Sequence, residues 1–305
     1  MDKMTIKEFG LVLGEMIESF LNNVTVESVT IPKNNQQRAG LSIRKIGCNV
    51  APTIYIEELY KKYLADASLK DLRDEAIRVY NEAMRHPMPV VNEDVFSRKY
   101  LAENAFISLI GYESNIDYAR DIVGEVVFGN LLAMVRVAVT SPDSNPERDG
   151  IQSFALTQSA LEATGLTGAE IIAAAKANTI EKGFDCIEMN EMARQIAECL
   201  PEELRGLAVP VIDVPMYILT NKEKCFGASA MCDYTLLKNI WANIGDFFIL
   251  PSSIHEVIVI ADCEDVEAKE LAELVQSVNA GSVTPEDKLV DSVYRFDGIA
   301  VRRVG

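Results

Sequence analysis

The sequence predicts an α+β protein in which antiparallel or mixed sheets carry helices packed on one face. Short segments alternate apolar and polar residues with the period of two that is typical of strands, and longer segments repeat apolar residues with helical spacing. Pairs of strands are mixed with helices, without the steady β-α-β order of a doubly wound parallel sheet. Antiparallel pairing is therefore favoured.

The first 88 residues are expected to form one domain with the element order α, β, β, β, α, α. Thr5 is a candidate cap for the first helix, and Ser68 and Asp71 occupy capping-box positions for the last one. Turn-forming residues between two alternating segments predict a hairpin over 24–46. The expected elements are a helix over 5–21, strands over 24–31, 41–46 and 49–56, and helices over 57–65 and 68–86.

Residues 89–305 are expected to form a second domain, because the segment HPMPVV at 86–91 interrupts regular structure. One of its hairpins has the polar tip SPDSNPERDG. The segments 154–165 and 217–228 share an aromatic residue, a leucine and a threonine followed by an amide, which suggests a repeated strand–helix unit. The expected strands are 101–111, 130–139, 151–157, 214–220, 246–250 and 255–261, and the expected helices are 116–123, 158–164, 168–178, 188–199, 234–245 and 265–281.

The charge of the chain is strongly negative. Its 46 acidic and 29 basic residues give a net charge of −17. This balance argues against direct binding of nucleic acid, which requires a basic surface for the phosphates. It fits an acidic surface that keeps the protein dispersed, or one that imitates the DNA backbone and binds another protein.

Several features predict a cytoplasmic location. The N-terminal residues are interrupted by charges and do not form a signal peptide, and the longest apolar stretch, 126–139, is too short to span a bilayer. The six cysteines contain no C-x-x-C pair, which fits reduced thiols better than disulfides or structural zinc. We expect no membrane association, and the sequence leaves the oligomeric state open.

Motifs for common chemistries are missing from the sequence. It contains no Walker A loop, no G-x-G-x-x-G, no G-x-S-x-G and no complete H-E-x-x-H. No metal and no cofactor are therefore predicted.

The segment FFILPSSIHEVIVI, residues 247–260, contains the candidate catalytic residues Ser252, Ser253, His255 and Glu256. On an extended strand, Ser253 and His255 share one face and Glu256 lies on the other. A serine hydrolase would then need its acid from elsewhere, with Asp213, Asp233 and Asp291 as examples. The alternative, which we favour, is a turn whose hydroxyl groups satisfy the backbone at the entrance to a strand.

Cys225 is a second candidate nucleophile in this half of the chain. No histidine lies near it in the sequence, so a buried or unreactive thiol is the favoured interpretation.

Several stretches resemble an uncharacterised family of domains of unknown function that occurs in clostridial bacteria, often in mobile genetic elements. The resemblance covers nearly the whole chain and is carried by GLSIRKIGCNVAPTIYIEELY, MYILTN followed by GASAM, DFFILPSSIHEVIVI and LVDSVYRFD. It implies a cytoplasmic bacterial protein and no particular activity. The recurrent positions of the family are Asn49, Pro52, Tyr55, Asn221, Gly227, Ala228, Pro251, Ser252, Ser253, His255, Glu256 and Tyr294.

The sequence does not reveal a specific function. It favours a non-enzymatic interaction protein, accessory to a mobile element, whose acidic surface binds another protein in a DNA-mimic or anti-defence role. A serine hydrolase that uses Ser252 or Ser253 with His255 is the alternative. The candidate binding residues are Asn49, Tyr55, Tyr217 and Asn221.

Overall fold

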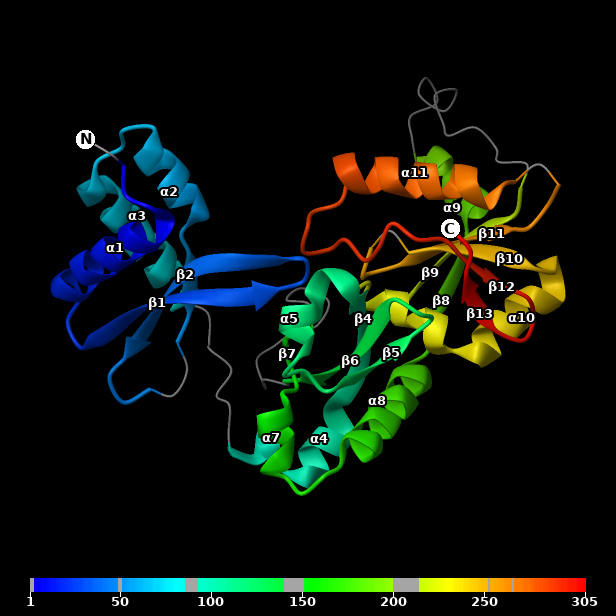
Figure 1. Ribbon diagram of the computed structural model, residues 1–305, viewed down its shortest axis with the longest axis horizontal. Helices are drawn as coiled ribbons and strands as arrows, with labels where there is room; N and C mark the ends of the chain where they lie inside the picture. The colour runs from blue at the N-terminus through cyan, green and yellow to red at the C-terminus, as the bar shows by residue number, and fades with distance from the viewer. Residues whose placement is uncertain are drawn as a thin grey trace. The chain divides into compact units, whose positions relative to one another are not determined.

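The computed structural model describes residues 3–48, 51–85, 93–139, 151–199, 214–251, 253–264 and 266–305. They form two compact units, the first within Met1–Asn92 and the second within Glu93–Thr140 and Ser144–Gly305 (Figure 1). The predicted domain boundary at residue 88 lies outside the described residues and stays a prediction. The α+β class is confirmed, since all strand pairs of the three sheets are antiparallel.

The first unit has the predicted order of elements. These are α1 (Ile6–Phe20), β1 (Val24–Lys33), β2 (Gln36–Lys45), β3 (Thr53–Tyr55), α2 (Glu57–Leu64) and α3 (Leu69–Ala83). The Thr5 hydroxyl accepts a hydrogen bond from the N–H of Glu8, whose carboxylate accepts one from the N–H of Thr5, so the predicted cap of α1 is a capping box. The core of the unit forms where the apolar face of α1 packs against β2. It contains Phe9, Leu13, Ile17, Leu41 and Ile43.

The second unit contains two sheets, of which the smaller has the order β4-β6-β5 with β7 paired to β6. Helix α8 covers this sheet, and the N–H of Ile107 on β4 donates to the buried Thr179 hydroxyl on α8 at 2.8 Å. The elements of this part are η1 (Glu93–Phe96), α4 (Arg98–Asn104), β4 (Ala105–Gly111), η2 (Glu113–Asn115), α5 (Ile116–Ala119), β5 (Gly124–Val127), β6 (Leu131–Ala138), β7 (Ser153–Ala155), α7 (Gln158–Glu162) and α8 (Gly168–Lys182).

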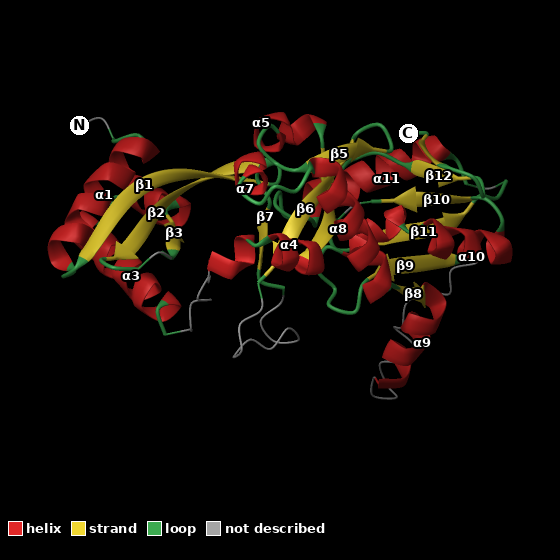
Figure 2. Cartoon of the chain, turned by 90° about the horizontal axis from the view of Figure 1, so that it is seen from below, coloured by secondary structure: helices red, strands yellow, loops and turns green. Residues whose placement is uncertain are grey.

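The larger sheet has six strands in the order β13-β12-β10-β11-β9-β8, and Figure 2 shows β12, β10, β11, β9 and β8 side by side. Its elements are β8 (Asp185–Glu188), α9 (Met189–Cys199), β9 (Met216–Thr220), η4 (Gly227–Cys232), α10 (Tyr234–Ile244), β10 (Phe247–Leu250), β11 (Val257–Ala261), α11 (Ala268–Gly281), β12 (Tyr294–Phe296) and β13 (Val301–Arg303).

Helices cover both faces of this six-stranded sheet, not one face as predicted. Phe248 on β10 belongs to the cluster that contains Leu271 and Val275 of α11. Its neighbour Phe247 belongs to the larger cluster that contains Leu237 of α10. Alternate residues of a strand point to opposite faces, so a strand that is apolar throughout, as β10 is, requires cover on both sides.

A buried polar network joins the two sheets of the second unit. The Tyr294 hydroxyl on β12 donates to the Asn130 side-chain oxygen just before β6, and the Asn130 amide donates to the Ser292 hydroxyl at 3.1 Å. Burial raises the pKa of Tyr294 above its usual range, so the phenol stays protonated as the donor.

Two predictions about this unit are corrected. The strand predicted over 101–111 begins only at Ala105, because Ser97 caps the short helix α4 by accepting a hydrogen bond from the N–H of Tyr100. The two segments of the suggested repeat also differ. The first enters the smaller sheet and leads to α7, whereas the second enters the larger sheet and leads to a loop and the 3₁₀ helix η4.

Within the described ranges, none of the helices combines the length and the apolar character that crossing a membrane would require.

Candidate functional site

The candidate site lies where β9 ends and β11 begins, two antiparallel neighbours in the larger sheet. The Thr220 hydroxyl donates to the carbonyl oxygen of His255 at 2.8 Å, and the N–H of Ala228 donates to the carbonyl oxygen of Ile254 at 3.2 Å. Gly227 lies between these bonds. A Cβ atom there would collide with the His255 carbonyl oxygen and lie 2.5 Å from the Thr220 hydroxyl. A glycine therefore lets the two segments approach closely.

The loop that follows β9 holds Cys225 in a strained turn. Lys224 and Phe226, on either side of it, have φ angles of 50° and 60°. Residues other than glycine adopt this left-handed conformation at a cost of about 1–2 kcal/mol. Such strain is concentrated at functional sites.

Asn221 fixes this turn through both ends of its side-chain amide. Its nitrogen donates to the Cys225 carbonyl oxygen at 2.7 Å, and its oxygen accepts from the Cys225 N–H at 3.0 Å. The predicted binding residue Asn221 is thus a positioning residue for Cys225.

The imidazole of His255 lies between Cys225 and an aspartate. Its Nε2 is 3.1 Å from Oδ1 of Asp287, and its Nδ1 accepts a hydrogen bond from the N–H of Phe226 at 3.3 Å. The Thr284 hydroxyl donates to Oδ2 of Asp287 at 2.8 Å and thereby orients the carboxylate. Since Nε2 is engaged by Asp287, Nδ1 is the nitrogen on the side of Cys225.

The charged form of His255 is stabilised at this position. A hydrogen bond with the side chain of Cys225 and the carboxylate of Asp287 raise the pKa of His255 to about 9, against the opposing effect of burial. The bond from the Phe226 N–H needs an unprotonated Nδ1 and therefore describes the neutral ring.

The predicted serines have different surroundings. Ser252 lies outside the described residues. Ser253 is buried, and its hydroxyl accepts a hydrogen bond from the backbone N–H of His255 at 3.0 Å, while the ring nitrogens face other residues. The strand begins at Val257, after a bend, so the predicted alternation from Ser253 to His255 does not apply. Glu256 is half-buried between His255 and β11.

The carboxylate beside His255 is not one of the three acids considered from the sequence. Asp213 lies outside the described residues. Asp233 caps α10 by accepting from two backbone N–H groups, and Asp291 accepts from Asn279 at 2.7 Å and from Lys288. Sequence reasoning missed Asp287, whose TPED segment carries no pattern that points to a histidine 32 residues earlier.

The other predicted binding residues have structural contacts. Tyr217 lies on β9 opposite Val259 and Glu188, and burial raises its pKa. Tyr55 lies on β3 in the first unit, with the Arg38 guanidinium 3.9 Å from its ring centroid. Asn49 lies outside the described residues.

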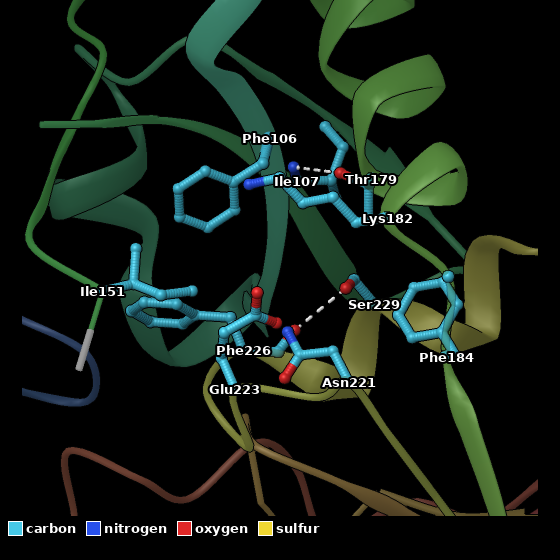
Figure 3. A pocket seen from close by; sticks show the side chains of 11 residues that line it. Phe106, Ile107, Ile151, Thr179, Lys182, Phe184, Asn221, Glu223, Phe226 and Ser229 are labelled. Atoms are coloured by element: carbon cyan, nitrogen blue, oxygen red, sulfur yellow. Dashed lines mark hydrogen bonds between the residues drawn. The ribbon is translucent and has the colours of Figure 1, made fainter. Parts of the chain in front are cut away.

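A small pocket adjoins the loop that carries Cys225. The rings of Phe106 and Phe226 line one side of it and Phe184 the other, and the centroids of the first two rings are 5.7 Å apart (Figure 3). Asn221 and Glu223 of the loop complete the wall. The pocket could hold an apolar group beside the strained turn.

Among the residues that the structure describes, no three His, Cys, Asp or Glu side chains are grouped so as to hold a metal ion. Burial raises the pKa of Cys232 in η4 to about 12. The thiol that lies beside a base is Cys225.

Comparison with known proteins identifies the family. The model of a family of unknown function, DUF5688, matches residues 6–298. The chain belongs to this family. No curated protein and no solved structure matches the chain significantly. Membership of DUF5688, a family of unknown function, therefore assigns no activity to the chain.

Proposed function

We propose that the second unit carries out thiol-dependent acyl transfer, with Cys225 as nucleophile, His255 as general base and Asp287 as the residue that orients the imidazole. One observation carries the proposal: a thiol, an imidazole and a carboxylate from three separate segments converge at a strained turn. This combination is the one that activates nucleophilic cysteines. The proposal departs from the non-enzymatic role that the sequence favours.

The chemistry proceeds in two balanced steps. At neutral pH the raised pKa of His255 keeps the proton of the Cys225 thiol on the imidazole. The thiolate forms a bond to the acyl carbon of an ester, thioester or amide, and the leaving alcohol, thiol or amine takes the proton from Nδ1 of His255 as its bond breaks. Water then gives a proton to His255, attacks the thioester and releases the acid and the free thiol. Throughout, Asp287 holds the imidazole through Nε2.

The proposal concerns this chain and not its whole family. His255 and Asn221 are among the positions that carry the family resemblance. A relative that lacks the thiol would keep the arrangement of loops without the chemistry.

Selective labelling tests the proposal. Iodoacetamide at neutral pH is expected to alkylate Cys225 faster than the exposed Cys48, Cys186 and Cys263, while Cys232 stays unmodified. Digestion and mass spectrometry measure the rate at each cysteine. The full-length chain should also turn over members of a panel of fluorogenic esters, thioesters and amides, and Cys225→Ala should abolish this turnover.

Either of two results would reject acyl transfer. One is alkylation of Cys225 no faster than that of Cys263, and the other is turnover that survives in Cys225→Ala. A fluorophosphonate probe distinguishes a serine hydrolase from a cysteine-dependent enzyme. Labelling that is lost when Ser253 is substituted would identify Ser253 as the nucleophile.

We propose, as a second function, that the acidic surface binds another protein, as an accessory of a bacterial mobile element with a DNA-mimic or anti-defence role. The net charge of −17 supports it. A pull-down from a bacterial lysate, with a neutral protein of similar size as control, is expected to enrich nucleic-acid-handling or defence proteins in a salt-dependent manner. Failure to enrich any of these proteins would exclude the mimic role.

A further inference from the structure

Arg136 on β6 lies next to the proposed nucleophile and has no carboxylate partner among the residues that the structure describes. Burial lowers the pKa of Arg136, although the residue keeps part of its surface exposed. Its Nε donates to the Ser153 hydroxyl at 3.0 Å, and one terminal nitrogen donates to the Ser153 carbonyl oxygen at 3.1 Å. Within the described part of the chain, it forms no ion pair with a carboxylate.

This environment differs from that of most other arginines in the second unit. Arg98, Arg120, Arg194, Arg295 and Arg302 each form an ion pair with Asp or Glu. A guanidinium has five N–H donors in a planar fork that matches a carboxylate. Ser153 takes two of these donors. A desolvated cation with donors left over is suited to an anionic ligand.

The position of Arg136 is tied to Cys225 through Phe226. The guanidinium carbon lies 4.7 Å from the ring centroid of Phe226, whose ring centroid is 6.0 Å from that of His255. Phe226 directly follows Cys225 in the chain, so the guanidinium packs against the turn that holds Cys225. An anion held by Arg136 would therefore lie beside the thiol and the imidazole.

We propose that Arg136 forms a carboxylate-binding subsite, so that the site takes acyl substrates that carry a carboxylate close to the scissile carbonyl. Ser153 positions the guanidinium through its hydroxyl and carbonyl oxygens. That the bound carboxylate belongs to an acyl substrate rests on the acyl-transfer function proposed above. The binding of a carboxylate by Arg136 beside Cys225 does not depend on that function.

A pair of reagents measures the subsite directly. Iodoacetate and iodoacetamide alkylate the same thiolate by the same displacement of iodide, and they differ in that iodoacetate carries a carboxylate. The ratio of their rate constants at one cysteine therefore cancels the reactivity of that thiol. The exposed Cys263 of the same chain gives the reference ratio.

In the wild-type chain, the iodoacetate-to-iodoacetamide ratio at Cys225 is expected to exceed that at Cys263 by about tenfold, the factor that corresponds to 1.4 kcal/mol. Arg136→Met should reduce the ratio at Cys225 to that at Cys263. Arg136→Lys should keep part of the excess, because it retains the charge without the fork. Succinate should slow alkylation of Cys225 by iodoacetamide in the wild-type chain without slowing that of Cys263, a measurement that needs no variant.

Equal ratios at Cys225 and Cys263 in the wild-type chain, or no protection by succinate, would overturn the subsite. The subsite would also be overturned if Arg136→Met lowered the rate constants of iodoacetate and iodoacetamide at Cys225 by the same factor. That result would mean that Arg136 stabilises the thiolate and does not bind a ligand. A raised ratio without turnover of any acyl substrate keeps the carboxylate site and rejects acyl transfer. Turnover of acyl substrates, together with equal iodoacetate-to-iodoacetamide ratios at Cys225 and Cys263, supports acyl transfer and rejects the carboxylate site.

Discussion

Substitution of His255 by glutamine is expected to slow the alkylation of Cys225 by iodoacetamide by up to about 30-fold, because a cysteine without a basic partner is only a few per cent thiolate at neutral pH. Glutamine keeps a hydrogen-bonding side chain but cannot take up the thiol proton. The rate constant at Cys225 is measured by quenched alkylation and mass spectrometry at neutral pH, and turnover of acyl substrates should fall in parallel. Alkylation of Cys263 should not change and serves as the internal control.

Two aspartates on one segment provide a matched pair of variants for the same reaction. Asp287→Asn weakens the support of the imidazole through Nε2 and should reduce the rate less than His255→Gln does. Asp291→Asn alters contacts with Asn279 and Lys288 and should leave the rate unchanged. Equal rates in the wild-type chain and His255→Gln would show that the imidazole does not activate Cys225.

Substitution of Gly227 by alanine is expected to lower the free energy of unfolding by about 3 kcal/mol, the upper part of the usual range for overpacking. The added Cβ would meet the His255 carbonyl oxygen, the Thr220 hydroxyl at 2.5 Å and the Asn221 backbone nitrogen at 2.7 Å. Two of these are backbone atoms, which cannot move aside without separating β9 from β11. Urea denaturation of the two proteins measures the difference.

Gly168→Ala is the control for Gly227→Ala. Gly168 begins α8, and a Cβ there would have no atom within 4 Å. Its substitution should be neutral or slightly stabilising, because alanine favours helices more than glycine does. If the urea midpoint of Gly227→Ala equals that of the wild-type chain, the close approach of Gly227 to the His255 carbonyl oxygen does not stabilise the fold. Slower alkylation of Cys225 in a folded Gly227→Ala protein would show that the approach also aligns the thiol with His255.

Elements with strong local signals were predictable from the sequence. Thr5 and Ser68 cap helices where their hydroxyls were expected to, and the hairpin over 24–46 forms from two alternating segments. These signals depend on residues three or four positions apart or on a period of two. The strands β5, β8, β12 and β13, of three or four residues each, were not predicted. Strands of the same length in β3, β7 and β10 were predicted because they lie within longer extended or apolar segments.

The candidate site was predictable only in part. The cluster of serines, histidine and glutamate around His255 marks this segment as a candidate site in the sequence. The turn expected at Ser253 agrees with the structure, in which the Ser253 hydroxyl accepts a hydrogen bond from the N–H of His255. The prediction that Ser253 and His255 share one face of a strand was wrong, because the chain bends at these residues and β11 begins only at Val257. The sequence favours an unreactive Cys225 because no histidine is near it along the chain, whereas the fold brings the imidazole of His255 to within 3.3 Å of the N–H of Phe226, the next residue.

By itself, the sequence determined the α+β class, the order of the elements in the first unit and the negative charge of the chain. Those properties follow from composition and from interactions between residues close together along the chain. The tertiary structure decided that Cys225, His255 and Asp287 meet and that Arg136 lies beside them. Antiparallel pairing of β9 with β11 and the packing of two sheets bring these residues together across long separations, and no local pattern encodes such contacts.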